Sequence, residues 1–234
     1  KGGSDTGNLT DRLLEELQCE TVIKIPFLNG LLDIKESIVV TWIIMAVIVA
    51  LCIIFVRNLK VENPGKGQLL LESAISTGQN FFEDVMGKEN RKYIPYLLTV
   101  LIYIGISNII GLFGFKPPTK DLNVTAAIAI MSMILIEYSG IHKNGVKHWV
   151  KHFAEPVPFV APIMILEIVI RPLSLCMRLF GNVLGAFVIM ELLKTVVPVL
   201  APIPFSFYFD IFDGLLQAYV FVFLTALFMN EEQE

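Results

Sequence analysis

The stretch from Ile38 to Val56, IVVTWIIMAVIVALCIIFV, contains 19 residues and no charged side chain. An α-helix rises about 1.5 Å per residue, so a helix of this length crosses a hydrocarbon layer of roughly 30 Å. The composition agrees, because 55% of the 234 residues are hydrophobic and only 17% are charged. The sequence therefore predicts an integral membrane protein.

Further apolar segments follow this first span. The last of them is an almost uninterrupted apolar stretch from Phe159, which prolines 198, 202 and 204 divide into two long helices. We therefore expect an all-α integral membrane protein with about five membrane-embedded helices, the last two forming a hairpin. An extramembrane segment, residues 1–37, would precede a single membrane domain, residues 38–234. The expected embedded segments are 38–56, 93–115, 122–141, 159–196 and 203–229.

Basic residues in the connections predict the orientation. Residues 57–92 hold six Lys and Arg and residues 142–152 hold three, whereas residues 116–121 hold two and the 194–204 turn holds one. Basic residues concentrate in cytoplasmic loops. We therefore expect the N-terminus outside and the C-terminus in the cytoplasm. Residues 69–87 are predicted to form an amphipathic helix along the interface.

Several classes of site are not supported. The net charge of −4 is small and spread along the chain, which indicates no nucleic-acid partner. His148 and His152 have the i, i+4 spacing of a metal pair, but Trp149 replaces the glutamate of the zincin signature, so an interfacial anchor is favoured over metal. No catalytic motif of the GxSxG or HExxH type is present. We expect no metal, no cofactor and no disulfide framework among Cys19, Cys52 and Cys176.

Polar side chains recur along both of the last two apolar segments. Each set follows the three- and four-residue spacing of one helix face. A charge at the membrane centre costs about 2.5–3.5 kcal/mol on insertion scales, so its default interpretation is functional. We predict that the two stripes line one water-filled path. Their members are Glu167, Arg171, Ser174, Arg178, Asn182 and Gly185 on the first arm, and Ser206, Asp210, Asp213 and Gln217 on the second.

The two arginines of the first arm have different neighbours. Glu167 lies one turn before Arg171, so this pair is either a structural ion pair or part of a channel lining. Arg178 has no acid three or four residues away on its own helix. Its partner is expected elsewhere, either at Asp210 or Asp213 in a structural ion pair or at a carboxylate on another subunit.

The segment RPLSLCMRLFGN, joined to LLQAYVFVFLTALFMNEE near the C-terminus, resembles subunit a of the F-type ATP synthase. The segments NPGKGQLLLE, SNIIGLFGF and DLNVT extend the resemblance to all but about the first 35 residues. By position, Arg178 matches the essential stator arginine of that family. Asn182 matches its channel asparagine, and Gln217 its partner glutamine on the last helix.

At three places the sequence departs from the family pattern. Phe187 stands nine residues after Arg178, where many relatives have an acid or a histidine, and Glu191 follows one turn later. Asp210 stands where relatives have histidine or glutamate. Glu167 precedes the proline by five residues instead of eight. The further residues expected to line the channel are Glu167, Arg171, Glu191, Asp210 and Asp213.

The resemblance implies a stator role. Two long tilted helices would pack against a rotating c-ring, whose small subunits each carry one carboxylate. Two offset aqueous half-channels would bring ions to and from those carboxylates. Arg178 would prevent a short circuit and so couple ion flow to rotation and ATP synthesis. Implied partners are the c-ring, the peripheral-stalk b subunits, the remaining ATP synthase complex and the lipid bilayer.

The resemblance also implies that the chain is not an enzyme by itself and lies in a bacterial plasma membrane. We expect H+ as the transported ion, with a Na+-translocating version of the same subunit as the alternative. An independent ion channel or secondary transporter is a further alternative, although the sequence has no internal repeat of the kind found in such carriers.

Overall fold

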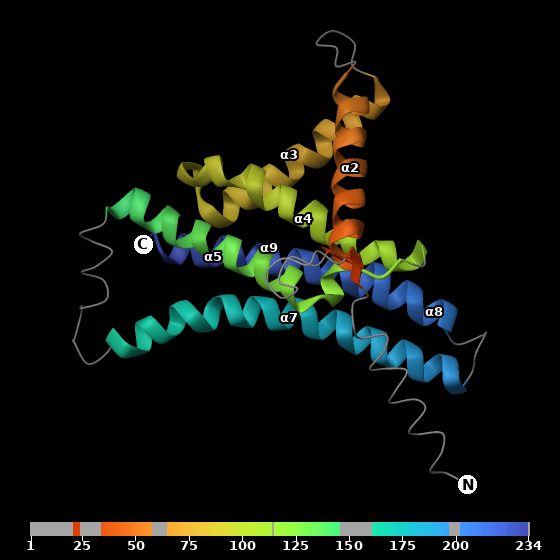
Figure 1. Cartoon of the computed structure of the whole chain (residues 1–234). Helices are drawn as coiled ribbons and strands as arrows, with labels where there is room; N and C mark the ends of the chain where they lie inside the picture. Colours follow the sequence, from red (N-terminus) through yellow and green to blue (C-terminus); the bar gives the residue numbers. More distant parts are fainter. Residues whose placement is uncertain are drawn as a thin grey trace.

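The structure is a computed structural model, and it describes residues 21–23, 34–57, 65–113, 115–145, 161–196 and 202–233. These residues are almost entirely helical, which confirms the predicted all-α class (Figure 1). Five helices in the described ranges are long and apolar enough to cross a membrane, as the sequence predicted. The division of the chain at residue 37 stays a prediction. The five helical segments are Glu36–Val56, Lys88–Phe113, Leu122–Asn144, Leu166–Lys194 and Pro204–Glu231.

The first long helix, α2 (Glu36–Val56), is held mainly at its beginning. Two short antiparallel strands, β1 (Thr21–Ile23) and β2 (Ile34–Lys35), lead into it. The hydroxyl groups of Thr41 and Tyr103 lie 3.2 Å apart and tie α2 to the next span. Figure 1 shows α2 at a steep angle to the other long helices. Its buried residues all lie in its first nine positions and are Ser37, Val40 and Ile44.

The core of the described part lies where α9 (Gly214–Glu231) packs on its neighbours. These are α4 (Ile94–Ile109), α5 (Leu122–Asn144) and the end of α3 (Lys66–Met86), which follows the predicted amphipathic pattern. Between membrane helices such a core is stabilised mainly by van der Waals packing, because lipid tails are as apolar as these side chains. Fully buried members include Phe82, Leu97, Ile104, Ile136, Phe221 and Val222.

The connection between α4 and α5 consists largely of two short 3₁₀ helices, η3 (Ile110–Phe113) and η4 (Pro118–Lys120). Asp121 follows η4 and caps α5, because its carboxylate accepts a hydrogen bond from the Asn123 backbone N–H at 3.0 Å. The same carboxylate accepts from Ser37 Oγ at 2.8 Å. The beginning of α2 and the α4–α5 connection therefore lie at the same end of the molecule.

The last two spans form the predicted hairpin. The first arm is α7 (Ala161–Val196), and it runs beside α9 in the opposite direction (Figure 1). The second arm begins with α8 (Pro202–Ser206) and passes through a π-helix, η5 (Phe207–Asp213), before α9. A π-helix bonds residue i to i+5, so side chains in it do not follow α-helical spacing. The expectation of one continuous α-helical stripe along the second arm was therefore wrong for this stretch.

Candidate functional site

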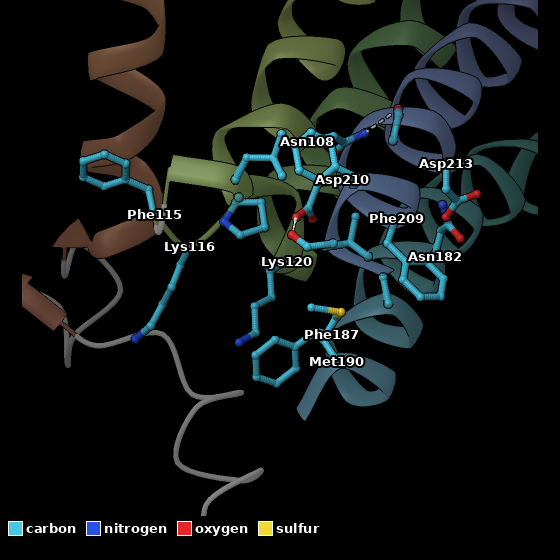
Figure 2. A pocket seen from close by; sticks show the side chains of 18 of the residues that line it. Asn108, Phe115, Lys116, Lys120, Asn182, Phe187, Met190, Phe209, Asp210 and Asp213 are labelled. Atoms are coloured by element: carbon cyan, nitrogen blue, oxygen red, sulfur yellow. Dashed lines mark hydrogen bonds between the residues drawn. The ribbon is translucent and has the colours of Figure 1, made fainter. Parts of the chain in front are cut away.

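A pocket of about 640 Å³ lies between the later part of α7 and η5, and the α4–α5 connection lines a further wall. Figure 2 shows carboxylates, amides and amines pointing toward this space from all three sides. The pocket therefore joins polar groups of both hairpin arms, although Asn182 is the only member of the predicted first-arm stripe that lines it. The polar residues among those that line it are Asn108, Lys116, Lys120, Asn182, Lys194, Ser206, Asp210 and Asp213.

The π-helix supplies both carboxylates of the pocket. Asp210 accepts a hydrogen bond from Ser206 Oγ at 2.6 Å, which fixes one of its oxygens. Gly111 of η3 lies against the same carboxylate, since a Cβ at this glycine would stand 3.1 Å from Asp210 Oδ1. Asp213 and Asn182 line the same space from η5 and α7. Two carboxylates beside an amide in one cavity are able to bind a small cation.

Asn108 connects η4 to the beginning of α9. Its side-chain N–H donates to the Gly214 carbonyl oxygen at 2.9 Å, and its carbonyl oxygen accepts from Thr119 Oγ1 at 2.9 Å. Both side chains are buried. Gly214 permits this close approach, because a Cβ there would stand only 2.8 Å from Asn108 Cβ. The network ties the α4–α5 connection to the point where the π-helix ends.

Lys120 is a site residue that the sequence did not single out. It is only 7% exposed, and its ammonium lies 3.3 Å from the centre of the Phe187 ring on α7. A cation over an aromatic face is attracted by the ring quadrupole. In the sequence, Lys120 counted only as one of two basic residues in a short loop, and no local pattern linked it to Phe187.

Arg178 lies on the exposed face of α7. It forms no ion pair with Asp210, Asp213 or any other acid within the described ranges. Its guanidinium thus sits on a face that is otherwise largely apolar. The large exposed apolar side chains on the preceding turns are Leu166, Val169, Ile170, Leu173 and Met177.

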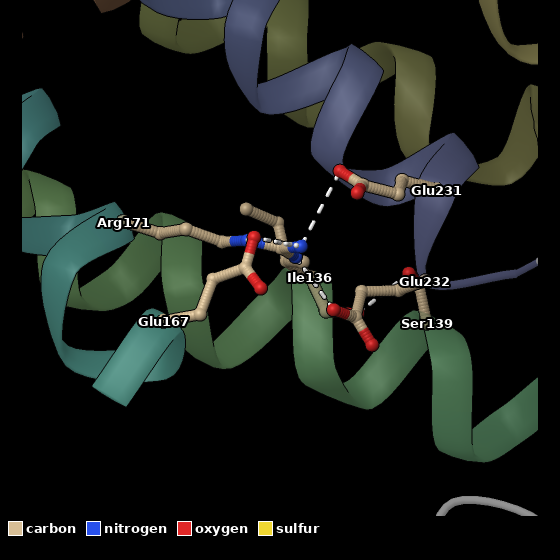
Figure 3. Close-up of polar contacts among 6 residues, drawn as sticks. All are labelled: Ile136, Ser139, Glu167, Arg171, Glu231 and Glu232. Carbon is tan, nitrogen blue, oxygen red and sulfur yellow. Dashed lines mark hydrogen bonds and ion pairs between the residues drawn. The ribbon is translucent and has the colours of Figure 1, made fainter. Parts of the chain in front are cut away.

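Arg171 takes part in a cluster of three carboxylates (Figure 3). Its guanidinium lies 3.0 Å from Glu167 and 3.3 Å from Glu231, and it also bonds to Glu232. The Glu167 pair follows from the i, i+4 spacing in the sequence. The sequence did not indicate Glu231 and Glu232 as partners of Arg171, because they lie about 60 residues away from it in the chain.

Two predicted site residues lie away from the paired carboxylates of the pocket. Gln217 is 7% exposed on α9, and its Nε2 is buried with no hydrogen-bond partner among the described residues. Glu191 lies near the end of α7 and forms an ion pair with Lys194 at 3.3 Å. Neither residue lines the pocket as the sequence-based stripe and the resemblance implied.

The structure describes only some of the candidate metal and thiol residues. Cys19, His148 and His152 lie outside the described residues. Within them, Cys52 and Cys176 are free thiols, and no cluster of three or more His, Cys, Asp or Glu side chains is placed to hold a metal ion.

Comparisons with known proteins agree on one family. A family model described as "ATP synthase A chain" matches residues 38–230. ATP synthase subunit a of Moorella thermoacetica is 35% identical over 201 residues, which cover 86% of this chain and 91% of that protein. ATP synthase subunit a 2 of a Bradyrhizobium species is 32% identical over 202 residues, with 86% and 90% covered. ATP synthase subunit a of Geotalea daltonii is 33% identical over 204 residues, with 85% and 88% covered.

Proposed function

The chain belongs to the ATP synthase A chain family, and from this premise we propose that it is the stator subunit a of an F-type ATP synthase. It is an integral membrane protein of a complex that synthesises ATP and transports ions. In this proposal the chain performs no chemistry itself. It faces a c-ring, is held by peripheral-stalk b subunits, and guides ions between the two sides of the membrane.

The observation that carries the proposal is the position of Arg178. A guanidinium stays positively charged in proteins, and a charge in the membrane interior costs about 2.5–3.5 kcal/mol on insertion scales. Arg178 is nevertheless exposed on an apolar face without an ionic partner in the described part of the chain. A c-ring carboxylate that passes this face provides the missing counter-charge. A fixed cation there also blocks a direct leak between the two half-channels.

The pocket supports the outer half-channel of this proposal. An ion that enters from outside meets Asn182, Asp210 and Asp213 before it reaches the ring. It neutralises a ring carboxylate, which then faces lipid at far lower cost than an anion does. After nearly a full turn the carboxylate releases its ion to the other half-channel. The driving force is about 2.3 kcal/mol per charge per 100 mV.

The second half-channel is proposed near Glu167 and Arg171, at the other end of the hairpin. Gln217 supports a polar contact in the membrane interior between the two half-channels. A buried amide N–H without a hydrogen-bond partner costs about 1–3 kcal/mol. Nε2 of Gln217 has no such partner among the described residues. A water molecule or a passing carboxylate would satisfy it.

We propose H+ as the ion, because the resemblance to the F-type family favours it, with Na+ as the alternative, since the two carboxylates of the pocket accept either ion. We also propose a bacterial plasma membrane, with the N-terminus outside and the C-terminus in the cytoplasm. The pocket and the α4–α5 connection would then face outward. This orientation is supported by the low number of basic residues in the connections at that end.

The Arg178→Ala variant tests the proposal in inverted vesicles that contain the whole complex. We expect loss of both ATP-driven ion pumping and ATP synthesis, while the subunit still co-purifies with the c-ring. Arg57→Ala is the matched control, because Arg57 is also an exposed arginine and lies at the end of α2. Substantial ATP synthesis by Arg178→Ala would refute the stator role. Ion conduction by the purified chain alone would favour an independent channel.

A further inference from the structure

The short helix η4, Pro118–Lys120, is buried beside α7 and against α2, α4 and α5, and it belongs to neither arm of the hairpin. Thr119 is completely buried and donates its hydroxyl proton to Asn108 Oδ1 at 2.9 Å. Asn108 in turn donates to the carbonyl oxygen of Gly214, directly after the π-helix. Through these two hydrogen bonds, η4 is fixed to the second arm.

The next residue of η4 contacts the first arm. The Lys120 ammonium lies 3.3 Å from the centre of the Phe187 ring, and Lys120 is 7% exposed. Figure 2 shows the Lys120 side chain extending across the pocket wall toward Phe187 rather than toward Asp210. Cation–π contacts of this kind are strongest when they are desolvated. Adjacent residues of one turn, Thr119 and Lys120, therefore hold opposite walls of the pocket.

We propose that η4 is a strut that sets the separation between α7 and η5, with Lys120 and Thr119 as its positioning residues. This inference rests on the proposed function, because it assigns to the strut the width of the outer half of the ion path. Asn182 on one wall and Asp210 on the other keep their separation only while both ends of η4 are attached. Loss of either end lets the later part of α7 move away and admits more water to the pocket.

The reactivity of a thiol placed in the pocket tests the strut. Val183 lines the pocket from α7, one turn before Phe187, and Cys is close to Val in volume. The Val183→Cys reporter is made in a background carrying Cys19→Ser, Cys52→Ser and Cys176→Ala. The probe is a membrane-impermeant charged maleimide, applied to the whole complex in right-side-out and in inverted vesicles.

Four variants distinguish the effect of losing the Lys120–Phe187 cation–π contact from the effect of changing side-chain size. Lys120→Met and Phe187→Leu remove the cation–π contact, whereas Lys120→Arg and Phe187→Tyr retain it. Loss of a desolvated cation–π contact corresponds to about a tenfold change in population, so we expect about tenfold faster labelling with Lys120→Met and Phe187→Leu. Labelling of Lys120→Arg and Phe187→Tyr is expected within about twofold of the parent. Thr119→Val detaches the other end and is expected to speed labelling in the same direction.

Equal labelling rates in the parent, Lys120→Met and Phe187→Leu would overturn the strut. Absence of labelling in every variant and from both sides would overturn it as well, because no widened aqueous space would then exist. If Lys120→Met does not assemble with the complex, Phe187→Leu and Thr119→Val decide the outcome. Failure of the stator role itself is recognised separately, from the pumping activity of Arg178→Ala.

Discussion

Arg171 of α7 and Glu232, directly after the end of α9, form a hydrogen-bonded ion pair across 61 positions of sequence. The Arg171 side chain is 9% exposed, and its guanidinium also lies 5.1 Å from the centre of the Phe228 ring. The pair joins the two arms of the hairpin at the end opposite to the pocket. The arms are therefore fastened at both ends, by different chemistry.

Arg171→Met is expected to destabilise the subunit by about 2–3 kcal/mol, because three carboxylates lose their common counter-charge. This loss of stability is at the low end of the range for breaking a buried ion pair, since Glu167 and Glu231 are half exposed and partly screened by solvent. The measurement is the temperature at which the subunit dissociates from the solubilised complex. Glu231→Gln with Glu232→Gln should restore part of the loss in Arg171→Met. A variant as stable as the parent would show that the cluster is not structural.

Gly140→Ala is expected to weaken the same end of the hairpin through packing. A Cβ at Gly140 of α5 would stand 2.9 Å from the Glu232 backbone oxygen and 3.3 Å from Glu232 Cβ. The turn that carries Glu232 must then move away, at a cost of about 1–3 kcal/mol for overpacking. Thermal dissociation of the complex measures the effect. Gly67→Ala on α3 is the control, since a Cβ there meets nothing within 4 Å and should not destabilise.

Asp210→Asn is expected to slow ATP-driven proton pumping by at least about tenfold, because the amide keeps the shape of the side chain but no longer accepts a proton. Assembly should be unchanged, since the amide oxygen still accepts the hydrogen bond from Ser206. Pumping in inverted vesicles measures the effect. Ser206→Ala, which retains the carboxylate, is expected to have a smaller effect. Parental rates in Asp210→Asn would exclude a role for this carboxylate in ion transfer.

The sequence predicted those features that depend on neighbouring residues. The apolar runs identified the five long helices, and the spacing of Glu167 and Arg171 identified their ion pair. The sequence did not predict that Glu231 joins this ion pair. Acidic residues near the C-terminus look the same in the sequence whether they lie in a solvated tail or bind an arginine. Long-range ionic partners depend on helix packing, which no local spacing encodes.

The second arm shows a different limit of sequence reasoning. The spacing of Ser206, Asp210, Asp213 and Gln217 was interpreted on an α-helix, but Phe207–Asp213 forms a π-helix. The π-helix leaves Asp210 and Asp213 in the pocket, while Gln217 lies in the buried core. Polar residues and prolines mark both α-helical and π-helical turns in such a segment. The local sequence therefore did not distinguish the two helix types in this segment.

The fastening of α7 at two points has a mechanical consequence for Arg178. Arg178 lies seven residues after Arg171 and nine before Phe187, or about 10 Å and 14 Å along the helix axis. In the proposed stator, a turning ring pushes sideways on α7 near this residue. A helix held on both sides of the point where a force acts bends far less there than a helix held on one side only. In this proposal the α7 backbone at Arg178 is held on both sides while the ring turns, although Arg178 has no ion pair within the described ranges.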